Sequence, residues 1–239
     1  MDKDDVFVTV IPAPTATRPL LGLTVLVVED SRFACEAIRL LCLRSGARIR
    51  RADRLRSARR HLRVYRPSVV IVDLGLPDGD GVDLIRELTR AEPRVSVVLG
   101  TSGDETGQAA ALEAGADGFI AKPITSLATF QQLILSKLPP DRQPVGVREM
   151  TDETVEPDQM AFQDDMAHIA DVLGDAPDGR ALDYVAQFLS GVAKSAHDHG
   201  LEQAAVALAE RRALGHAARA ETAVLAGLIQ ERLTRKVAI

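Results

Sequence analysis

Val25-Leu26-Val27-Val28-Glu29-Asp30 is an apolar run of strand length that ends in two carboxylates. Two further runs share this form, and they are Val69-Val70-Ile71-Val72-Asp73 and Gly118-Phe119-Ile120-Ala121-Lys122-Pro123. Their length and β-branched content predict buried strands. Open parallel sheets bind ligands outside the carboxyl ends of their strands. We therefore expect the charged ends to share one crevice, suited to a divalent cation and a phosphoryl group.

The pattern between residues 20 and 138 alternates between strand and helix signals. The predicted strands lie near 23–29, 47–51, 68–72, 95–99 and 118–121. The predicted helices lie near 32–45, 54–65, 80–91, 105–114 and 125–137. Five strand–helix units predict a doubly wound α/β fold, with a parallel sheet between two layers of helices.

The rest of the chain has a different composition. Residues 1–19 are predicted to be a flexible arm, and the polar, Pro-rich stretch 139–158 is predicted to be a linker. Residues 159–239 show only helical signals, with helices near 159–173, 180–198, 201–213 and 217–236, and Gly200 is expected to break the second of these. Apolar stripes at three- to four-residue spacing predict a small all-α domain. Because its core would be thin, dimerisation or docking on the first domain are both open.

Charge and hydropathy limit the cellular location and the binding partners that the sequence predicts. No apolar run approaches the length of a membrane span, and the acidic start of the chain is unlike a secretory signal, which predicts a cytoplasmic protein. Cys35 and Cys42 are expected to be buried thiols. Residues 150–239 carry 8 Lys and Arg against 15 Asp and Glu. This acidic part argues against binding to duplex DNA, which rests largely on neutralised phosphates.

The charged residues at the strand ends are suited to metal binding and to phosphoryl transfer. Glu29, Asp30 and Asp73 would supply oxygen ligands to Mg²⁺. A carboxylate beside a metal can also attack phosphorus and form an aspartyl phosphate. Lys122 would neutralise charge on the phosphoryl oxygens. A hydroxyl after the fourth strand, from Thr101 or Ser102, could hydrogen-bond the new phosphate.

Three segments together carry a family resemblance. They are Val-Val-Glu-Asp-Ser (27–31), Val-Asp-Leu-Gly-Leu-Pro-Asp-Gly-Asp-Gly (72–81) and Ala-Gly-Ala-Asp-Gly-Phe-Ile-Ala-Lys-Pro (114–123). Residues 22–138 resemble the receiver domain of bacterial two-component response regulators, which implies a flavodoxin-like sheet with strand order 2-1-3-4-5.

The resemblance also implies a role for each site residue. Asp73 would be the phosphoacceptor, and Glu29 and Asp30 would hold Mg²⁺ together with the backbone carbonyl of Gly75. Lys122 would pair with the phosphate, in a Lys-Pro turn that is commonly cis. Phe119 would be the aromatic switch.

The fourth strand departs from the family, which has Ser or Thr at its end. Counting back from Lys122 places Gly100 there, whereas counting forward from Asp73 is compatible with Thr101. We take Thr101 as the switch hydroxyl, with Ser102 or neither residue as the alternatives.

The sequence therefore predicts a response regulator rather than a substrate-turnover enzyme. A sensor histidine kinase or a phosphotransfer protein would phosphorylate Asp73, and a homodimer is a further possible assembly. Two alternatives stay open: an aspartyl-phosphate enzyme on a similar fold, and an adaptor that never accepts phosphate. A phosphatase of that type usually has a second Asp two residues after its nucleophile, where this chain has Gly75.

Histidines of the C-terminal part raise two further hypotheses. His216-Ala217-Ala218-Arg219 could be a degenerate form of the His-x-x-Lys pattern of a helical phosphotransfer module. His197 and His199 would point to nearly opposite sides of a helix, which is poor geometry for a shared metal.

Overall fold

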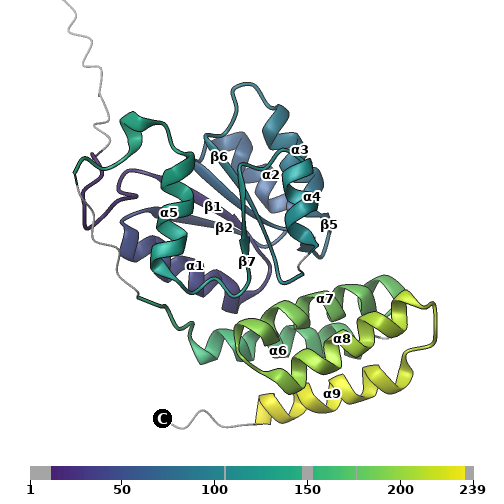
Figure 1. Cartoon of the computed structure of the whole chain (residues 1–239). Helices are drawn as coiled ribbons and strands as arrows, with labels where there is room; N and C mark the ends of the chain where they lie inside the picture. The colour runs from purple at the N-terminus through teal and green to yellow at the C-terminus, as the bar shows by residue number, and fades with distance from the viewer. Residues whose placement is uncertain (1–11, 105, 147–152, 176, 235–239) are drawn as a thin grey trace, which may run out of the picture.

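The structure is a computed structural model that describes residues 12–104, 106–146, 153–175 and 177–234. An α/β domain comes first, and a bundle of helices packs against one end of it (Figure 1). Within the described residues, no helix is both long and apolar enough to cross a membrane. The expectation of a flexible arm falls mainly on residues 1–11, which lie outside the described residues. Of its remaining residues, Pro19 is buried and Arg18 O accepts from the N–H of Leu21, whereas most of residues 12–18 are exposed.

Five parallel strands form the sheet in the order β2-β1-β3-β6-β7, which is the 2-1-3-4-5 order expected from the resemblance. Their bounds are β1 Thr24–Val28, β2 Arg48–Ala52, β3 Val69–Asp73, β6 Val97–Ser102 and β7 Gly118–Ala121. A two-stranded antiparallel sheet, β4 Gly75–Leu76 with β5 Gly79–Asp80, lies between the predicted strand near 68–72 and the start of α3. The central strands β1, β3 and β6 are buried on both faces, as expected for a parallel sheet between helices, whereas the edge strand β2 is mostly exposed.

Helices cover the two faces of the sheet (Figure 1). The helices are α1 Arg32–Ser45, α2 Leu55–Val64, α3 Gly81–Arg90, α4 Gly107–Glu113 and α5 Leu127–Lys137. One aliphatic core joins α1 and α5 to the sheet, and a second joins α2, α3 and α4 to the opposite face. Helix α1 begins at Ser31, whose hydroxyl accepts from the N–H of Ala34, and ends at Gly46, whose φ is 82°. Cys35 and Cys42 are free thiols in the first core, as expected.

Four helices make the C-terminal bundle: α6 Gln159–Gly174, α7 Gly179–Ser195, α8 His199–Ala213 and α9 Arg219–Thr234. The predicted apolar stripes meet in a core of their own, around Met166, Leu189 and Leu225. The prediction that Gly200 ends the second helix is wrong, because Gly200 lies inside α8. The chain turns earlier, at His197, which has a φ of 56°. The Asp198 carboxylate then caps α8 by accepting from the N–H of Leu201.

The segment 139–158 is more ordered than its composition suggests. A short 3₁₀ helix spans Pro140–Arg142, and residues 147–152 lie outside the described part. Thr154 then forms a bridge with Ser126, and Val155 is buried in the core beneath α1 and α5. Residues 153–155 of the expected linker are therefore anchored to the first domain by an apolar side chain.

Candidate functional site

The three predicted strand ends meet at one edge of the sheet. Because β1 and β3 are parallel neighbours, Glu29 and Asp30, which follow β1, lie beside Asp73, the last residue of β3. One carboxylate oxygen from each lies within 4.8 Å of the other two. Glu29 and Asp73 are buried. The arrangement concentrates three carboxylates in a space of the size that one cation fills.

Lys122 brings a positive charge to the same place from the end of β7. Its ammonium lies 2.7 Å from Glu29 Oε2 and 3.3 Å from Asp73 Oδ1. The side chain is only 7% exposed, so few water molecules compete for these contacts. The peptide bond from Lys122 to Pro123 is cis, as the sequence suggested.

Burial and mutual repulsion set the protonation of the cluster. Burial, followed by the neighbouring Glu29 charge, raises the pKa of Asp30 to about 7. The same two causes raise the pKa of Asp73 well above its ordinary value, against the opposing effect of Lys122. For Lys122, burial lowers the pKa, but the charges of Asp73 and Glu29 outweigh burial and raise it. One ammonium does not balance three carboxylates, so the site favours an additional cation.

The chemistry of these side chains fits Mg²⁺. All three candidate ligands are carboxylates, and hard divalent cations prefer oxygen. Asp30 Oδ1 is buried and has no hydrogen-bond partner within the described residues, although buried acceptors are normally satisfied. Gly75 lines the same cavity as the three carboxylates. A metal would satisfy the unpaired oxygen and part of the excess negative charge.

The fourth strand is β6 Val97–Ser102, which begins and ends later than the predicted 95–99 because it pairs with β3 as far as Asp73 and Thr101. The Thr101 hydroxyl is fully buried and donates to Ile120 O at 2.7 Å. Ser102, in contrast, lines the cavity that contains Asp73 and Lys122. The assignment of Thr101 as the switch hydroxyl stays a prediction. Of the two candidates, Ser102 is the one that lines the cavity in this structure.

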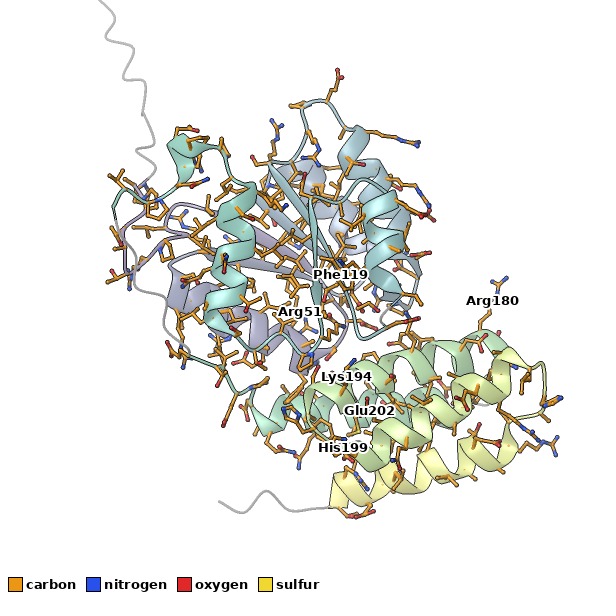
Figure 2. All side chains as sticks on the ribbon, in the orientation of Figure 1. Arg51, Phe119, Arg180, Lys194, His199 and Glu202 are labelled. Carbon is orange, nitrogen blue, oxygen red and sulfur yellow. The ribbon has the colours of Figure 1, made fainter. Side chains whose placement is uncertain are left out.

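Gly100 occupies the other position counted for that hydroxyl, and packing explains the glycine. A Cβ there would lie 2.6 Å from Ala111 Cβ on α4 and 3.3 Å from the Phe119 ring. Phe119 is half-buried against the core beneath α3 and α4, and Figure 2 labels it on this part of the first domain. The predicted aromatic switch residue therefore lies beside a position that has no side chain.

The sequence did not predict that the C-terminal bundle contributes to this site. The Tyr184 hydroxyl of α7 donates to Asp30 Oδ2 at 2.7 Å. Asp165 of α6 is buried at the start of α1, where it accepts from Ser31 Oγ and from the backbone N–H groups of Arg32 and Phe33. A cavity of about 850 Å³ lies between the domains. No sequence signal pairs residues more than 130 positions apart, so only the fold could reveal these contacts.

The C-terminal histidines singled out in the sequence are not part of the carboxylate cluster found in the described residues. His216 lies in the exposed connection between α8 and α9, and its Nδ1 is 3.4 Å from Arg211 Nη1. It is therefore neither on a helix nor at the carboxylate cluster. His197 lies in a turn and His199 at the start of α8, and neither joins the metal-type cluster found in the described residues.

Comparisons with known proteins agree with this geometry. Residues 25–134 match the family model of the response regulator receiver domain. The KDP operon transcriptional regulatory protein KdpE of Escherichia coli is 36% identical over 99 residues, covering 41% of this chain and 44% of that protein. The virulence transcriptional regulatory protein PhoP of Salmonella typhimurium is 34% identical over 100 residues, covering 41% of this chain and 45% of that protein. The chain thus spans less than half the length of these relatives.

Solved structures of receiver domains are also similar to the first half of the chain. The receiver domain of a signal transduction histidine kinase from Syntrophus aciditrophicus is 29% identical, covers 49% of this chain and 93% of that one, and has a TM-score of 0.43. The receiver domain of the sensor histidine kinase PA1611 from Pseudomonas aeruginosa, with a magnesium ion coordinated in its active-site cleft, is 24% identical. It covers 48% of this chain and 95% of that one, with a TM-score of 0.43. On the family match and the strand order, residues 25–134 are a response regulator receiver domain.

Proposed function

We propose that this protein is a two-component response regulator whose receiver accepts a phosphoryl group on Asp73. The observation that carries the proposal is the cluster itself: Asp73 lies beside two further carboxylates, with the Lys122 ammonium 3.3 Å from its Oδ1. Phosphoryl transfer requires chiefly such positioning and neutralisation of charge. A histidine kinase or a phosphotransfer protein would be the donor, since receiver domains pair with phosphohistidine.

Each residue of the cluster has its own role in the proposed phosphoryl transfer. Asp73 Oδ attacks phosphorus, the phosphorus–nitrogen bond of the donor breaks, and the imidazole leaves as a neutral base because its other ring nitrogen carries a proton. Lys122 holds the charge of the transferred group on one side. Glu29, Asp30 and the carbonyl of Gly75 would hold Mg²⁺ on the other side, where the ion would neutralise phosphoryl charge. Hydrolysis of the aspartyl phosphate resets the switch, so the chain turns over no separate substrate.

Mass spectrometry after incubation with acetyl phosphate and Mg²⁺ tests the proposal. We expect an adduct of one phosphoryl group that is absent from Asp73→Asn and from protein kept in EDTA. Asp83→Asn is a matched control, because Asp83 is an exposed residue in the first turn of α3. Protein that takes no phosphoryl group from acetyl phosphate or phosphoramidate would refute the proposal.

One observation favours the adaptor that never accepts phosphate. Helix α7 lies over the cluster, with Tyr184 on Asp30. A permanently covered acceptor would give no adduct in the same experiment. The rival aspartyl-phosphate enzyme lacks such support, because Gly75 occupies the place of its second acid.

The remaining expectations concern DNA binding, dimerisation and cellular location. The relatives named above are transcriptional regulatory proteins, but their similarity covers only the receiver half. The comparisons therefore do not support the expectation that no DNA is bound, which rests only on the acidic charge of residues 150–239. Homodimerisation also stays a prediction, and the apolar stripes that suggested it are used inside the bundle. A cytoplasmic location is part of the proposal.

A further inference from the structure

Helix α7 lies across the mouth of the acceptor site. Figure 1 shows α7 on the side of the bundle that faces the carboxyl ends of the strands. Tyr184 bonds to Asp30 near one end of the helix, and Lys194 Nζ, labelled in Figure 2, donates to Gly103 O at 3.3 Å near the other. Gln187 and Gly191 fall between them at helical spacing, so a single face of α7 spans the site. That face approaches from the side from which a phosphodonor would have to reach Asp73.

Gly191 is the residue of this face that lies opposite Lys122. A Cβ built on Gly191 would lie 3.7 Å from Lys122 Cδ and 3.9 Å from its Nζ, which is ordinary contact distance. The same ammonium is 3.3 Å from Asp73 Oδ1. A longer side chain at position 191 would therefore extend toward the acceptor carboxylate. With glycine there, the space belongs to the cavity of about 850 Å³ that Asp73, Lys122 and Gly191 line.

The sequence around Gly191 has the spacing of a phosphotransfer motif. Gly191-Val192-Ala193-Lys194 places a lysine three residues after the glycine, at the spacing of the His-x-x-Lys pattern of a helical phosphotransfer module. Here the segment lies on a bundle helix at the acceptor site, and only the histidine is missing. The position that matches the motif thus coincides with the position that faces Asp73.

Further contacts hold the bundle in this register. Asp165 accepts from Ser31 Oγ and from Arg32 N, both at 2.7 Å. The Phe33 and Phe162 rings pack edge to face with centroids 5.8 Å apart. Because both domains belong to one chain, their effective concentration is high and a separate protein must displace the bundle to reach the same surface.

We propose that α6–α9 form a phosphotransfer-type bundle that lacks its histidine and covers the acceptor face of its own receiver. The partner that this face fits is then a helical bundle with a phosphohistidine in the place of Gly191, and it engages only when the covering bundle leaves. This inference rests on the proposed phosphorylation of Asp73.

Restoring the histidine tests the inference. The full chain with Gly191→His is first treated with phosphoramidate in the presence of EDTA. The imidazole of residue 191 displaces ammonia from phosphorus and becomes phosphorylated. The reagent is then removed and Mg²⁺ is added. We expect the phosphorus–nitrogen bond at residue 191 to break, the Asp73 oxygen–phosphorus bond to form, and the imidazole to leave neutral with a proton from solvent on its other ring nitrogen. Intramolecular placement should make this loss at least about tenfold faster than in the Asp73→Asn background.

Gly227→His is the matched control, since Gly227 lies on α9 with nothing within 4 Å of a Cβ. Phosphate at residue 227 should be equally stable with and without Asp73. Phosphate at residue 191 that is equally stable in both backgrounds overturns the inference. If wild-type protein takes phosphate from acetyl phosphate but Gly191→His does not pass it on, only this inference fails. If no phosphate ever reaches Asp73 by either route, the proposed function fails.

Discussion

The Tyr184 hydroxyl donates a 2.7 Å hydrogen bond to Asp30 Oδ2 and so joins the bundle to a proposed metal ligand. Asp30 Oδ1 meanwhile has no hydrogen-bond partner within the described residues. One oxygen of this carboxylate is thus engaged by the bundle, and the other is free for a cation. Metal binding and bundle docking therefore act on the same side chain.

Tyr184→Phe should tighten Mg²⁺ binding, because it frees the second oxygen of Asp30. A hydrogen bond to a charged group contributes about 1.5–3 kcal/mol, so we expect a dissociation constant about tenfold lower. Isothermal titration calorimetry on the full chain measures it. Tyr65→Phe is the control, since the Tyr65 hydroxyl has no hydrogen-bond partner within the described residues. Weaker binding in Tyr184→Phe would mean that the hydrogen bond orients Asp30 for the metal rather than competing with it.

Lys122→Met should destabilise the metal-free protein, because Glu29 and Asp73 lose the cation that both contact. Breaking a buried ion pair on one side costs about 3–5 kcal/mol. Mg²⁺ should restore part of the loss by supplying positive charge to the same carboxylates. Urea unfolding with and without Mg²⁺ measures both effects, and Lys137→Met, at an exposed position at the end of α5, is the control. A variant as stable as wild type would show that the pair adds nothing to stability.

The receiver half could be predicted because its decisive residues end buried strands. Glu29, Asp73 and Lys122 lie at the ends of β-branched runs, and parallel strands bring such ends to one edge wherever the helices lie. The exact end of β6 could not be predicted in this way. It depends on its register with β3 and on Ala111 of α4, which leaves no space for a side chain at Gly100.

The docking of the bundle could not be predicted for a different reason. Its apolar stripes determine the bundle core, but the contacts to the receiver are single polar residues such as Asp165 and Tyr184. An isolated Asp or Tyr on a helix has no periodic signal. Gly191, which lies over Lys122, likewise gives no signal in the sequence. The lack of a side chain there becomes informative only once the neighbouring residues are known.

Substitutions at Thr101 and Ser102 should separate the two candidate switch hydroxyls. Thr101→Val removes the hydrogen bond to Ile120 O and should cost about 1 kcal/mol of stability with little change in phosphorylation. Ser102→Ala should instead slow phosphorylation of Asp73 by acetyl phosphate severalfold, because Ser102 lines the cavity beside it. Phosphorylation rates followed by intact mass, together with urea unfolding, distinguish the variants. The opposite pattern would assign the role to Thr101.

Asp165 should make the stability of the protein depend on pH. Burial raises its pKa from 3.8 to about 6, assisted by the Glu29 charge and opposed by hydrogen bonds from Ser31 and from the N–H groups of Arg32 and Phe33. Since the folded-state pKa exceeds the unfolded one, the folded protein binds the proton more tightly. The stabilisation is complete below pH 3.8 and is lost as the pH rises through 6.

The comparison with Asp165→Asn isolates this contribution. As the pH falls from 7 to 4, the unfolding free energy of wild type should rise relative to Asp165→Asn by up to about 3 kcal/mol, at 1.36 kcal/mol for each pKa unit. Asp164→Asn is the neighbouring control for the substitution itself, because Asp164 is an exposed residue paired with Arg32. Urea unfolding at several pH values measures the difference. A difference that stays constant from pH 4 to 7 would mean that the three hydrogen bonds outweigh burial and keep Asp165 ionised throughout.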